Sequence, residues 1–194
     1  MTRRKQRSAT GTVRSAAPEG ETLRGCYDAA VARLRKSPSS PSPSVVIEPL
    51  GSDLVALAQA YALDATTFPH CSLPPVFGDD APPAVWIARA EHGGPVIGFV
   101  GTRANRTTLE ISGLAVDSAH RRSGVGRALV RATTRSARAR GFDTIELHVS
   151  TGNEAAVTLY VRERFRKARR IEGFYSSHHF PDGGDAWVMI KDLR

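Results

Sequence analysis

A strand that leads through a glycine-containing turn into an arginine-rich helix is the feature that most constrains how this chain can fold. The apolar residues of TLEISGLAVD, 108–117, predict a strand. The segment SAHRRSGVGR that follows contains Gly124 and Gly126, and the apolar spacing beyond it predicts a helix from about Gly124 to Arg140. Gly141 stands where a helix commonly ends. Such a strand–turn–helix unit requires a sheet with a helix packed on its face.

The turn itself has the composition of an anion-binding site. The first N–H groups of a helix lack intrahelical partners and lie at the positive end of its dipole, so they attract anions. Arg121, Arg122 and Arg127 can add charge-assisted donors. The Walker pattern Gly-x-x-x-x-Gly-Lys-Ser/Thr is absent, and a dinucleotide fingerprint would need glycine or alanine where Leu129 stands. Taken alone, Gly-x-Gly also suits an ordinary structural turn.

Strands and helices predicted on both sides of this unit complete a sheet. Upstream, the pattern predicts a strand at 45–50, a helix with Ser52 as its N-cap, and two strands joined by the turn EHGG. Downstream, it predicts the strand TIELHVS, the helix NEAAVTLYVRER and a final strand pair, ARRIEGFY and DAWVMIKDL. We therefore expect an α/β fold with a mixed, mostly antiparallel sheet and helices on both faces.

Two segments of the chain resemble the GNAT superfamily of acyl-coenzyme A dependent N-acyltransferases. ISGLAVDSAHRRSGVGRALV resembles its Arg/Gln-x-x-Gly-x-Gly/Ala pyrophosphate loop, and IELHVSTGNEAAVTLYVRERF resembles its L-x-V-x-x-x-N-x-x-A-x-x-L-Y segment. With PVIGFVG and the C-terminal strands, the resemblance covers nearly all of 45–194. TFPH, LHVSTGN and GFYSSHHF look closest to the protein N-terminal acetyltransferases, namely the bacterial ribosomal-protein alanine type (RimI) and its eukaryotic N-alpha relatives.

The resemblance implies the GNAT fold and an acetyl-CoA dependent N-acetyltransferase, in which a primary amine attacks the thioester directly. The expected acceptor is the α-amine of a peptide or protein. Two alternatives stay open at this point. One is the same chemistry on a small amine, such as an aminoglycoside or a polyamine. The other is a non-catalytic acyl-CoA-binding module.

The resemblance also implies which residues hold the coenzyme. Backbone groups of the strand would bind the pantetheine arm, and the turn would bind the pyrophosphate. The full set is Leu114, Ala115, Val116, Arg121, Arg122, Ser123, Gly124, Val125, Gly126, Arg127, Asn153 and Ala156. The chain departs from the family in LYVRERF, where Arg164 replaces the usual glycine, so we expect an αL arginine or an altered helix end.

Three residues are candidates for proton transfer. Glu110 corresponds to a general-base glutamate in some members of the family, whereas its structural alternative is a solvent-facing edge carboxylate. His148 corresponds to a histidine that orders a proton-accepting water in some eukaryotic relatives, and its alternative is a partly buried structural histidine. Tyr160 would return a proton to the coenzyme thiolate, and its alternative is an aromatic core residue.

Two short segments are expected to contact the acceptor. By resemblance, Phe68, Pro69 and His70 line the pocket for the first residue of a peptide, and Phe174 and Tyr175 flank its backbone. Packing at the border of the core is the structural alternative for both. Neither segment has the ligand spacing of a metal site, and we expect none.

The basic charge lies mostly in the N-terminal segment. Residues 1–44 hold nine Lys/Arg and three Asp/Glu, within a total net charge of +8. We expect a disordered basic leader with a short helix at 21–36 and a Pro/Ser linker, followed by an acetyltransferase domain at 45–194. Nucleic acid is not an expected partner beyond weak contact with the leader. No run is long enough to cross a membrane. Cys26 and Cys71 show neither metal-ligand spacing nor a disulfide framework, so we expect a cytoplasmic protein. The expected assembly is a monomer or a homodimer.

Overall fold

The computed structural model describes residues 45–68, 72–73, 85–175 and 184–194. The expected leader, with its helix and linker, lies outside the described residues. So do Pro69 and His70. None of the described helices is both long enough and apolar enough to cross a membrane.

In the described part of the chain, seven strands form one sheet in the order β1-β2-β3-β4-β5-β7-β6. All neighbouring strands are antiparallel except β4 and β5, which are parallel. The mixed, mostly antiparallel sheet is therefore as predicted. The strands are β1 (Val46–Pro49), β2 (Val85–Arg89), β3 (Val96–Asn105), β4 (Thr108–Val116), β5 (Thr144–Ser150), β6 (Arg166–Ile171) and β7 (Ala186–Asp192).

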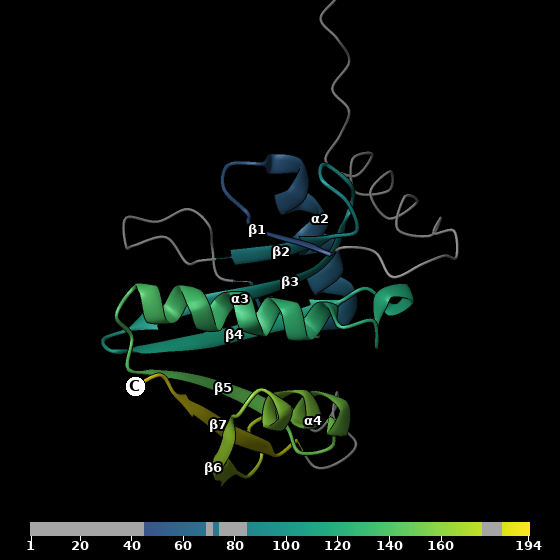
Figure 1. The fold of residues 1–194 in the computed structure, drawn as a ribbon. Coiled ribbons are helices and arrows are strands. Elements are labelled where there is room, and N and C mark those ends of the chain that lie inside the picture. The colour runs from purple at the N-terminus through teal and green to yellow at the C-terminus, as the bar shows by residue number, and fades with distance from the viewer. Residues whose placement is uncertain (1–44, 69–71, 74–84, 176–183) are drawn as a thin grey trace, which may run out of the picture.

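Helices cover both faces of this sheet, and each face has its own apolar cluster (Figure 1). Helices α3 (Val125–Ala139) and α4 (Glu154–Arg162) pack with the larger cluster. Helix α2 (Leu54–Thr67) packs with the smaller cluster on the other face. A short 3-10 turn, η1 (Ser118–His120), leads from β4 towards α3. The turn predicted to bind the coenzyme, at the start of α3, and Phe68, predicted to contact the acceptor, thus lie on opposite faces of the sheet.

Two element ends differ from the sequence expectation. The N-cap of α2 is Asp53 and not Ser52, because the Asp53 carboxylate accepts a hydrogen bond from the Ala56 amide at 2.9 Å. The strand expected at 168–175 begins earlier and ends at Ile171. Residues beyond Ile171 turn instead, since the Asp185 carboxylate accepts a hydrogen bond from the Gly173 amide at 2.9 Å.

Arg164 has the left-handed conformation expected from its place in the sequence, with φ of 67°. The Arg164 amide donates to the Val161 carbonyl at 3.0 Å, and the Phe165 amide donates to the Tyr160 carbonyl at 2.9 Å. These two bonds form a Schellman motif, in which the residue with positive φ is usually glycine. The hydrogen bonds of the helix end are therefore kept, and the side chain at Arg164 carries the steric cost.

We expect Arg164→Gly to stabilise the fold more than Arg164→Ala by about 1 kcal/mol, because only glycine removes the Cβ conflict at positive φ. Both substitutions remove the same charge, so their difference isolates the backbone effect. Urea denaturation of the three proteins measures it. Equal stability of the glycine and alanine variants would contradict this explanation.

Candidate active site

The central parallel strands β4 and β5 part halfway along the sheet. They pair only from Thr108 to Ile111 on β4 and from Thr144 to Leu147 on β5. Beyond that point β4 continues to Val116 and β5 to Ser150 without pairing to each other. The backbone of β4 that faces β5 therefore has no strand partner over its second half.

A β-bulge at Ser112 lies at the parting point. Ile111 pairs with Thr102 of β3 and Gly113 with Gly101, so Ser112 is an extra residue. The bulge reverses the faces of the strand. Before it, Leu109 and Ile111 join the core under α3, whereas after it Leu114 and Val116 pack on that side.

The backbone directions after the bulge follow from one hydrogen bond, which the Asp117 amide donates to the Ile97 carbonyl of β3 at 2.9 Å. Alternate residues of a strand turn their N–H and C=O groups to the same side, so Ala115 also faces β3. Leu114 and Val116 face the open edge, where Arg121 Nε donates to the Val116 carbonyl at 3.1 Å. Of the three backbone positions expected to hold pantetheine, Ala115 is therefore turned away.

The N-terminus of α3 lies next to this open edge and has no side-chain cap. Its N-cap is Gly124, with φ of 94°. In the other helices that the structure describes, α2 and α4, Asp53 and Asn153 provide a side-chain cap. Arg122 also has positive φ, at 65°. The first amide donors of α3 are thus left to an external acceptor, and the turn fits a diphosphate group.

We expect Gly124→Val to weaken coenzyme binding at least tenfold in a folded protein, because valine is strained at this positive φ and would displace the amide donors. Gly141 at the other end of α3 is a matched control. Its φ is 79°, and as at Gly124 there is nothing within 4 Å of an added Cβ. Calorimetric titration with acetyl-CoA should show near-normal affinity for Gly141→Val. Equal losses in both variants would attribute the effect to helix stability alone.

The other predicted coenzyme residues surround the turn with contacts of their own. Arg127 Nε lies 3.4 Å from the Glu163 carboxylate, and Ser123 Oγ donates to the His120 carbonyl. Asn153 caps α4 by accepting from the Ala156 amide at 3.1 Å. Val125 is buried in the core, so its backbone alone is available to a ligand. Asn153 therefore has a structural role beside the predicted one.

Two of the three candidate proton-transfer residues meet on the face of the sheet opposite α3 and α4. His148 Nδ1 lies 3.9 Å from Glu110 Oε1, and their side chains are 20% and 32% exposed. Glu146, which is not among the predicted bases, lies directly opposite Glu110 in the strand register. Residues of TIELHVS alternate between the two faces of the sheet, so Glu146 and His148 share one face, and this pattern could have identified Glu146. A partly solvated group of two carboxylates and one imidazole results.

Aromatic residues expected on the acceptor side cover this group. The Phe174 ring stacks on the His148 ring with centroids 4.6 Å apart and an interplanar angle of 3°. Tyr175 lies edge-on to Phe174 at 4.9 Å. Asp185 holds their backbone in place through Gly173, and this bond, together with Arg170, lowers the pKa of the Asp185 carboxyl. No sequence signal marked Asp185.

Tyr160 approaches from the α4 side. Its ring is 6% exposed and packs edge-on against Phe165 at 5.6 Å. Burial raises the pKa of Tyr160, and the nearby Tyr175 raises it further. Burial also raises the pKa of Tyr175. The ring of Tyr160 lies in the larger core cluster, which agrees with its structural interpretation, and its role as a proton donor stays a prediction.

The remaining acceptor-side residue within the described part is Phe68. It follows the last turn of α2 and packs against the smaller core cluster. After the undescribed 69–71, Ser72 is fixed by its amide, which donates to Asp64 at 3.0 Å. Ser72 lies so close to Gly113 that a Cβ there would collide with it. Phe68 and Ser72 are therefore each held in place, and Ser72 lies beside the bulge of β4.

The parallel strands β4 and β5 thus part beside the uncapped start of α3, and a carboxylate–imidazole group lies on the opposite face of the sheet. The sequence profile of the acetyltransferase (GNAT) family matches residues 51–165, and the chain belongs to this family. This membership confirms the predicted GNAT class.

Curated relatives include N-acetyltransferase 8B of Rattus norvegicus, 39% identical over 88 residues. That match covers 42% of this chain and 39% of the relative. N-acetyltransferase 8F1 of Mus musculus is 35% identical over 89 residues, with 43% and 39% covered. The chain thus matches about two fifths of the length of these relatives.

Solved structures confirm the fold. The ribosomal-protein-S18-alanine N-acetyltransferase of Escherichia coli superposes with a TM-score of 0.62 at 22% identity, covering 77% of this chain and 94% of that one. NAA60 of Arabidopsis thaliana in complex with acetyl-CoA gives 0.60 at 23% identity, covering 77% and 99%. Both identities are low enough that these likenesses establish the fold alone.

Proposed function

We propose that this chain transfers the acetyl group of acetyl-CoA to the α-amine of a peptide or protein, as an N-terminal acetyltransferase of the RimI and N-alpha type. The observation that carries the proposal is the group formed by Glu110 and His148, with Phe174 stacked on the imidazole. It lies on the face opposite the coenzyme turn, where an amine can enter without crossing the coenzyme. Among solved neighbours, one is the ribosomal-protein-S18-alanine enzyme and another, the NatC complex, is bound to a Gag peptide.

The coenzyme side is supplied by residues of β4 and α3. Leu114 and Val116 offer backbone groups to the pantetheine, and the amides from Gly124 to Arg127 receive the diphosphate. Acetyl-CoA contributes an acyl thioester, whose carbonyl carbon accepts the amine nitrogen. Asn153 holds the start of α4 in place through its cap and thereby positions the helix that carries Tyr160.

The acceptor side removes one proton from the amine, and Tyr160 donates one to the departing sulfur. A peptide α-amine has a pKa of about 8 and a lysine side chain about 10.4, so a carboxylate or imidazole completes deprotonation of the former at a smaller cost. Glu110 or His148 takes this proton, directly or through a water. The N–C bond forms and the C–S bond breaks. The phenol of Tyr160 protonates the thiolate, the new amide nitrogen releases its second proton to solvent, and the phenolate recovers a proton from solvent.

Acetyl-CoA turnover against a peptide library varied at its first two positions tests the acceptor. Free thiol is the readout, and the same peptides with a blocked α-amine are the matched controls. We expect turnover on free peptides, a strong dependence on the first residue, and none on blocked peptides. Turnover confined to a parallel panel of aminoglycosides and polyamines would overturn the peptide assignment while leaving acetyl transfer intact.

The base can be identified from the pH dependence of kcat/KM. We expect the acidic limb of the profile to disappear in either Glu110→Gln or His148→Ala, whichever removes the base, because a base must be unprotonated to act. The other variant should keep the acidic limb of the profile, and its activity should fall only because the remaining groups of the site change position. Glu146→Gln is the control on the same face. Profiles that stay unchanged in all three would mean that solvent takes the proton unaided.

A further inference from the structure

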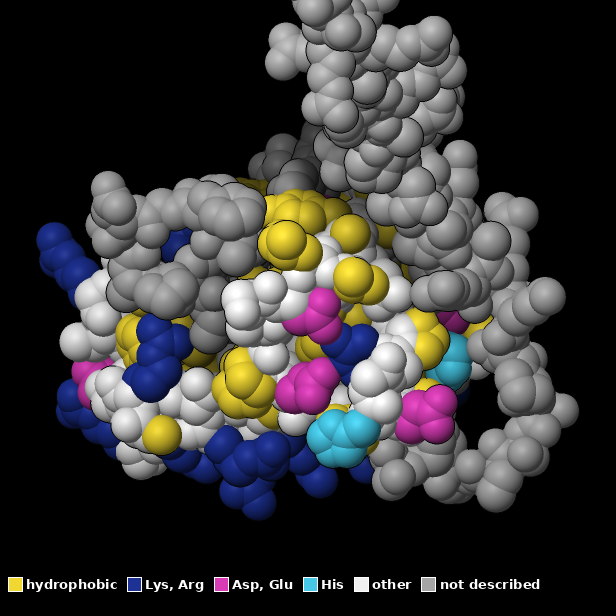
Figure 2. All heavy atoms as spheres, turned by 90° about the horizontal axis from the view of Figure 1, so that it is seen from above, with side chains coloured by type: hydrophobic (Ala, Val, Ile, Leu, Met, Phe, Trp, Pro, Cys, Tyr) yellow, Lys and Arg dark blue, Asp and Glu magenta, His cyan; other side chains and the backbone are white. Residues whose placement is uncertain are grey.

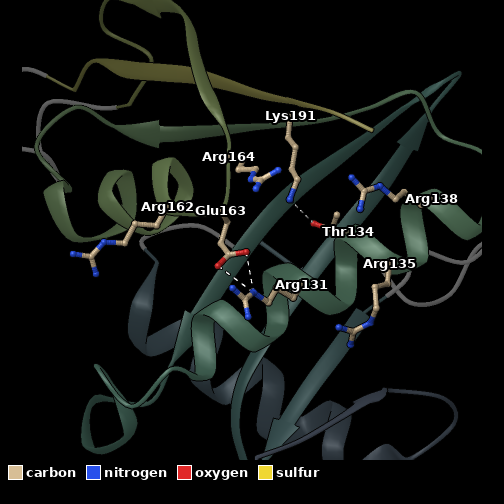
Figure 3. Close-up of a pocket in the computed structure, with 8 residues that line it drawn as sticks. All are labelled: Arg131, Thr134, Arg135, Arg138, Arg162, Glu163, Arg164 and Lys191. Atoms are coloured by element: carbon tan, nitrogen blue, oxygen red, sulfur yellow. Dashed lines mark hydrogen bonds and ion pairs between the residues drawn. The ribbon is translucent and has the colours of Figure 1, made fainter. Parts of the chain in front are cut away.

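A basic pocket lies on the face of α3 that is turned towards α4 and β7 (Figure 3). Its volume is about 420 Å³. Three elements converge on it: the middle and end of α3, the end of α4 and the end of β7. Five arginines and a lysine surround one carboxylate there. The lining residues are Arg131, Thr134, Arg135, Arg138, Arg162, Glu163, Arg164 and Lys191.

The positive charge of this pocket is mostly uncompensated. Glu163 is its one carboxylate, and it is already shared by Arg131 at 3.1 Å and Arg127 at 3.4 Å. Within the described residues, no carboxylate lies within ion-pair distance of Arg135, Arg138 or Arg162. Arginines four residues apart on a helix repel one another, so the row from Arg127 to Arg135 has a cost for the isolated helix. Arg131, Arg135 and Arg138 are themselves exposed, and they border a hollow that Lys191 also lines.

The floor of the pocket is the ammonium of Lys191. The residue is 9% exposed, and its Nζ donates to Thr134 Oγ1 at 3.2 Å. No described carboxylate lies within ion-pair distance of this nitrogen either. Burial lowers the pKa of Lys191; Glu163 opposes this shift, whereas Arg138, Arg164 and Arg131 add to it. A buried ammonium is normally paired with an anion, whereas the contacts of Lys191 Nζ among the described residues are Thr134 Oγ1 at 3.2 Å and the Phe165 ring at 5.5 Å.

The pocket is separated from the coenzyme turn along α3. Arg131 is six residues and Arg138 thirteen residues past Val125, which corresponds to about 9 and 20 Å along the helix axis. Guanidinium groups bind phosphate oxygens in pairs of parallel hydrogen bonds. The concave shape suits a compact anion, whereas an extended nucleic acid would need a continuous exposed track. Basic side chains do gather along one edge of the molecule in Figure 2, but the buried cation Lys191 lies in the pocket.

We propose that this pocket is a second anion site, separate from the coenzyme site, for a small ligand with two or more clustered phosphate groups. Arg135 and Arg138 provide the outer contacts, and Lys191 contacts the ligand from below. The expected ligand is a nucleoside or sugar polyphosphate, free in solution. The proposal does not depend on the acceptor of the acetyl group.

Inorganic tripolyphosphate is the probe, titrated by calorimetry into the full chain saturated with coenzyme A at 150 mM salt. We expect one bound ion per chain. Arg135→Gln/Arg138→Gln should weaken its binding at least 30-fold, whereas the KM for acetyl-CoA stays within a factor of two. The matched control is Arg103→Gln/Arg106→Gln, which removes the same charge from the β3–β4 hairpin. It should leave tripolyphosphate binding unchanged, and thermal denaturation checks that both variants are folded.

Three outcomes would overturn the proposal. If both double variants weaken binding equally, the ion responds only to net charge. If coenzyme A blocks the probe but 3′-dephospho-coenzyme A does not, or if the pocket variant raises the KM for acetyl-CoA, the pocket belongs to the coenzyme. If a 12-nucleotide single-stranded oligonucleotide binds through Arg135 and Arg138 and tripolyphosphate does not, the surface is a nucleic-acid site.

Discussion

Tyr160→Phe is expected to lower kcat by about 10- to 1000-fold while the affinity for acetyl-CoA changes less than threefold, because the hydroxyl is the proton donor in the proposed mechanism. The ring would keep its packing against Phe165. The raised pKa of Tyr160 keeps the phenol protonated over the working pH range, so the donor is always present. Steady-state kinetics together with calorimetric titration of acetyl-CoA separate the two effects.

A substitution at a second tyrosine tests whether the loss of any tyrosine hydroxyl lowers kcat. Tyr61 lies on α2 and is partly buried against the smaller core cluster on the other face of the sheet. Tyr61→Phe should leave kcat within a factor of two. Unchanged turnover in Tyr160→Phe would assign Tyr160 to the core alone, and the proton would then reach the sulfur from solvent.

Tyr160 also predicts a pH dependence of stability. Its folded-state pKa lies above the ordinary value of about 10. Above pH 10 the unfolded chain therefore loses this proton while the folded protein keeps it, and the free energy of unfolding falls as pH rises. We expect Tyr160→Phe to remove part of this decline. Denaturation series at pH 8 and pH 11 measure it, and parallel declines in both proteins would contradict the assignment of the burial effect to Tyr160.

The sheet, the helices and the glycine-containing turn before α3 could be predicted from the sequence, since each depends on local periodicity or on a glycine at a fixed place. The sequence also contains a signal for the bulge in β4. Leu109 and Ile111 are apolar at odd numbers, whereas Leu114 and Val116 are apolar at even numbers, and such a change of parity requires an extra residue in the strand. The same bulge turns the backbone of Ala115 away from the parted edge, which the predicted contact between Ala115 and pantetheine did not take into account.

Other features depend on contacts far along the chain and have no local signal. Ser52 and Asp53 are both good N-cap residues, and the choice between them depends on the Arg89 side chain that Asp53 also binds. β6 has one partner strand, and five of its six residues are exposed, so apolar periodicity could not fix its ends. The stacking of Phe174 on His148 requires the turn held by Asp185, twelve residues after Gly173.

Arg89 is a buried cation of β2 that binds residues of β1 and of the start of α2. It is 5% exposed, and its guanidinium binds Glu48 of β1 at 2.7 Å and Asp53 at the start of α2 at 2.8 Å. It also donates to the Gly94 carbonyl in the β2–β3 hairpin. One side chain thus connects β1, the start of α2 and the β2–β3 hairpin, and its removal leaves two neighbouring carboxylates and a carbonyl without their common donor.

We expect Arg89→Met to lower the free energy of unfolding by about 3 kcal/mol and Tm by about 10 °C. The value lies at the low end for a broken buried pair, because the side chains of Glu48 and Asp53 are 31% and 47% exposed and water can reach them. Arg103→Met, on an exposed part of β3, is the control and should change stability by less than 0.5 kcal/mol, as is usual for surface substitutions.

The same substitution should cost less in acid, and the sign follows from Asp53. The Ala56 amide, and to a smaller extent Arg89, lower the pKa of Asp53, so its stabilising contribution is present above the unfolded pKa of about 3.9. It is lost as pH falls through the folded pKa, when the carboxylate becomes neutral and no longer needs the cation. The difference in unfolding free energy between Arg89→Met and the unmodified protein should therefore shrink below pH 4. A difference that stays constant from pH 7 to pH 3 would mean that Arg89 acts through packing of its side chain and not through its charge.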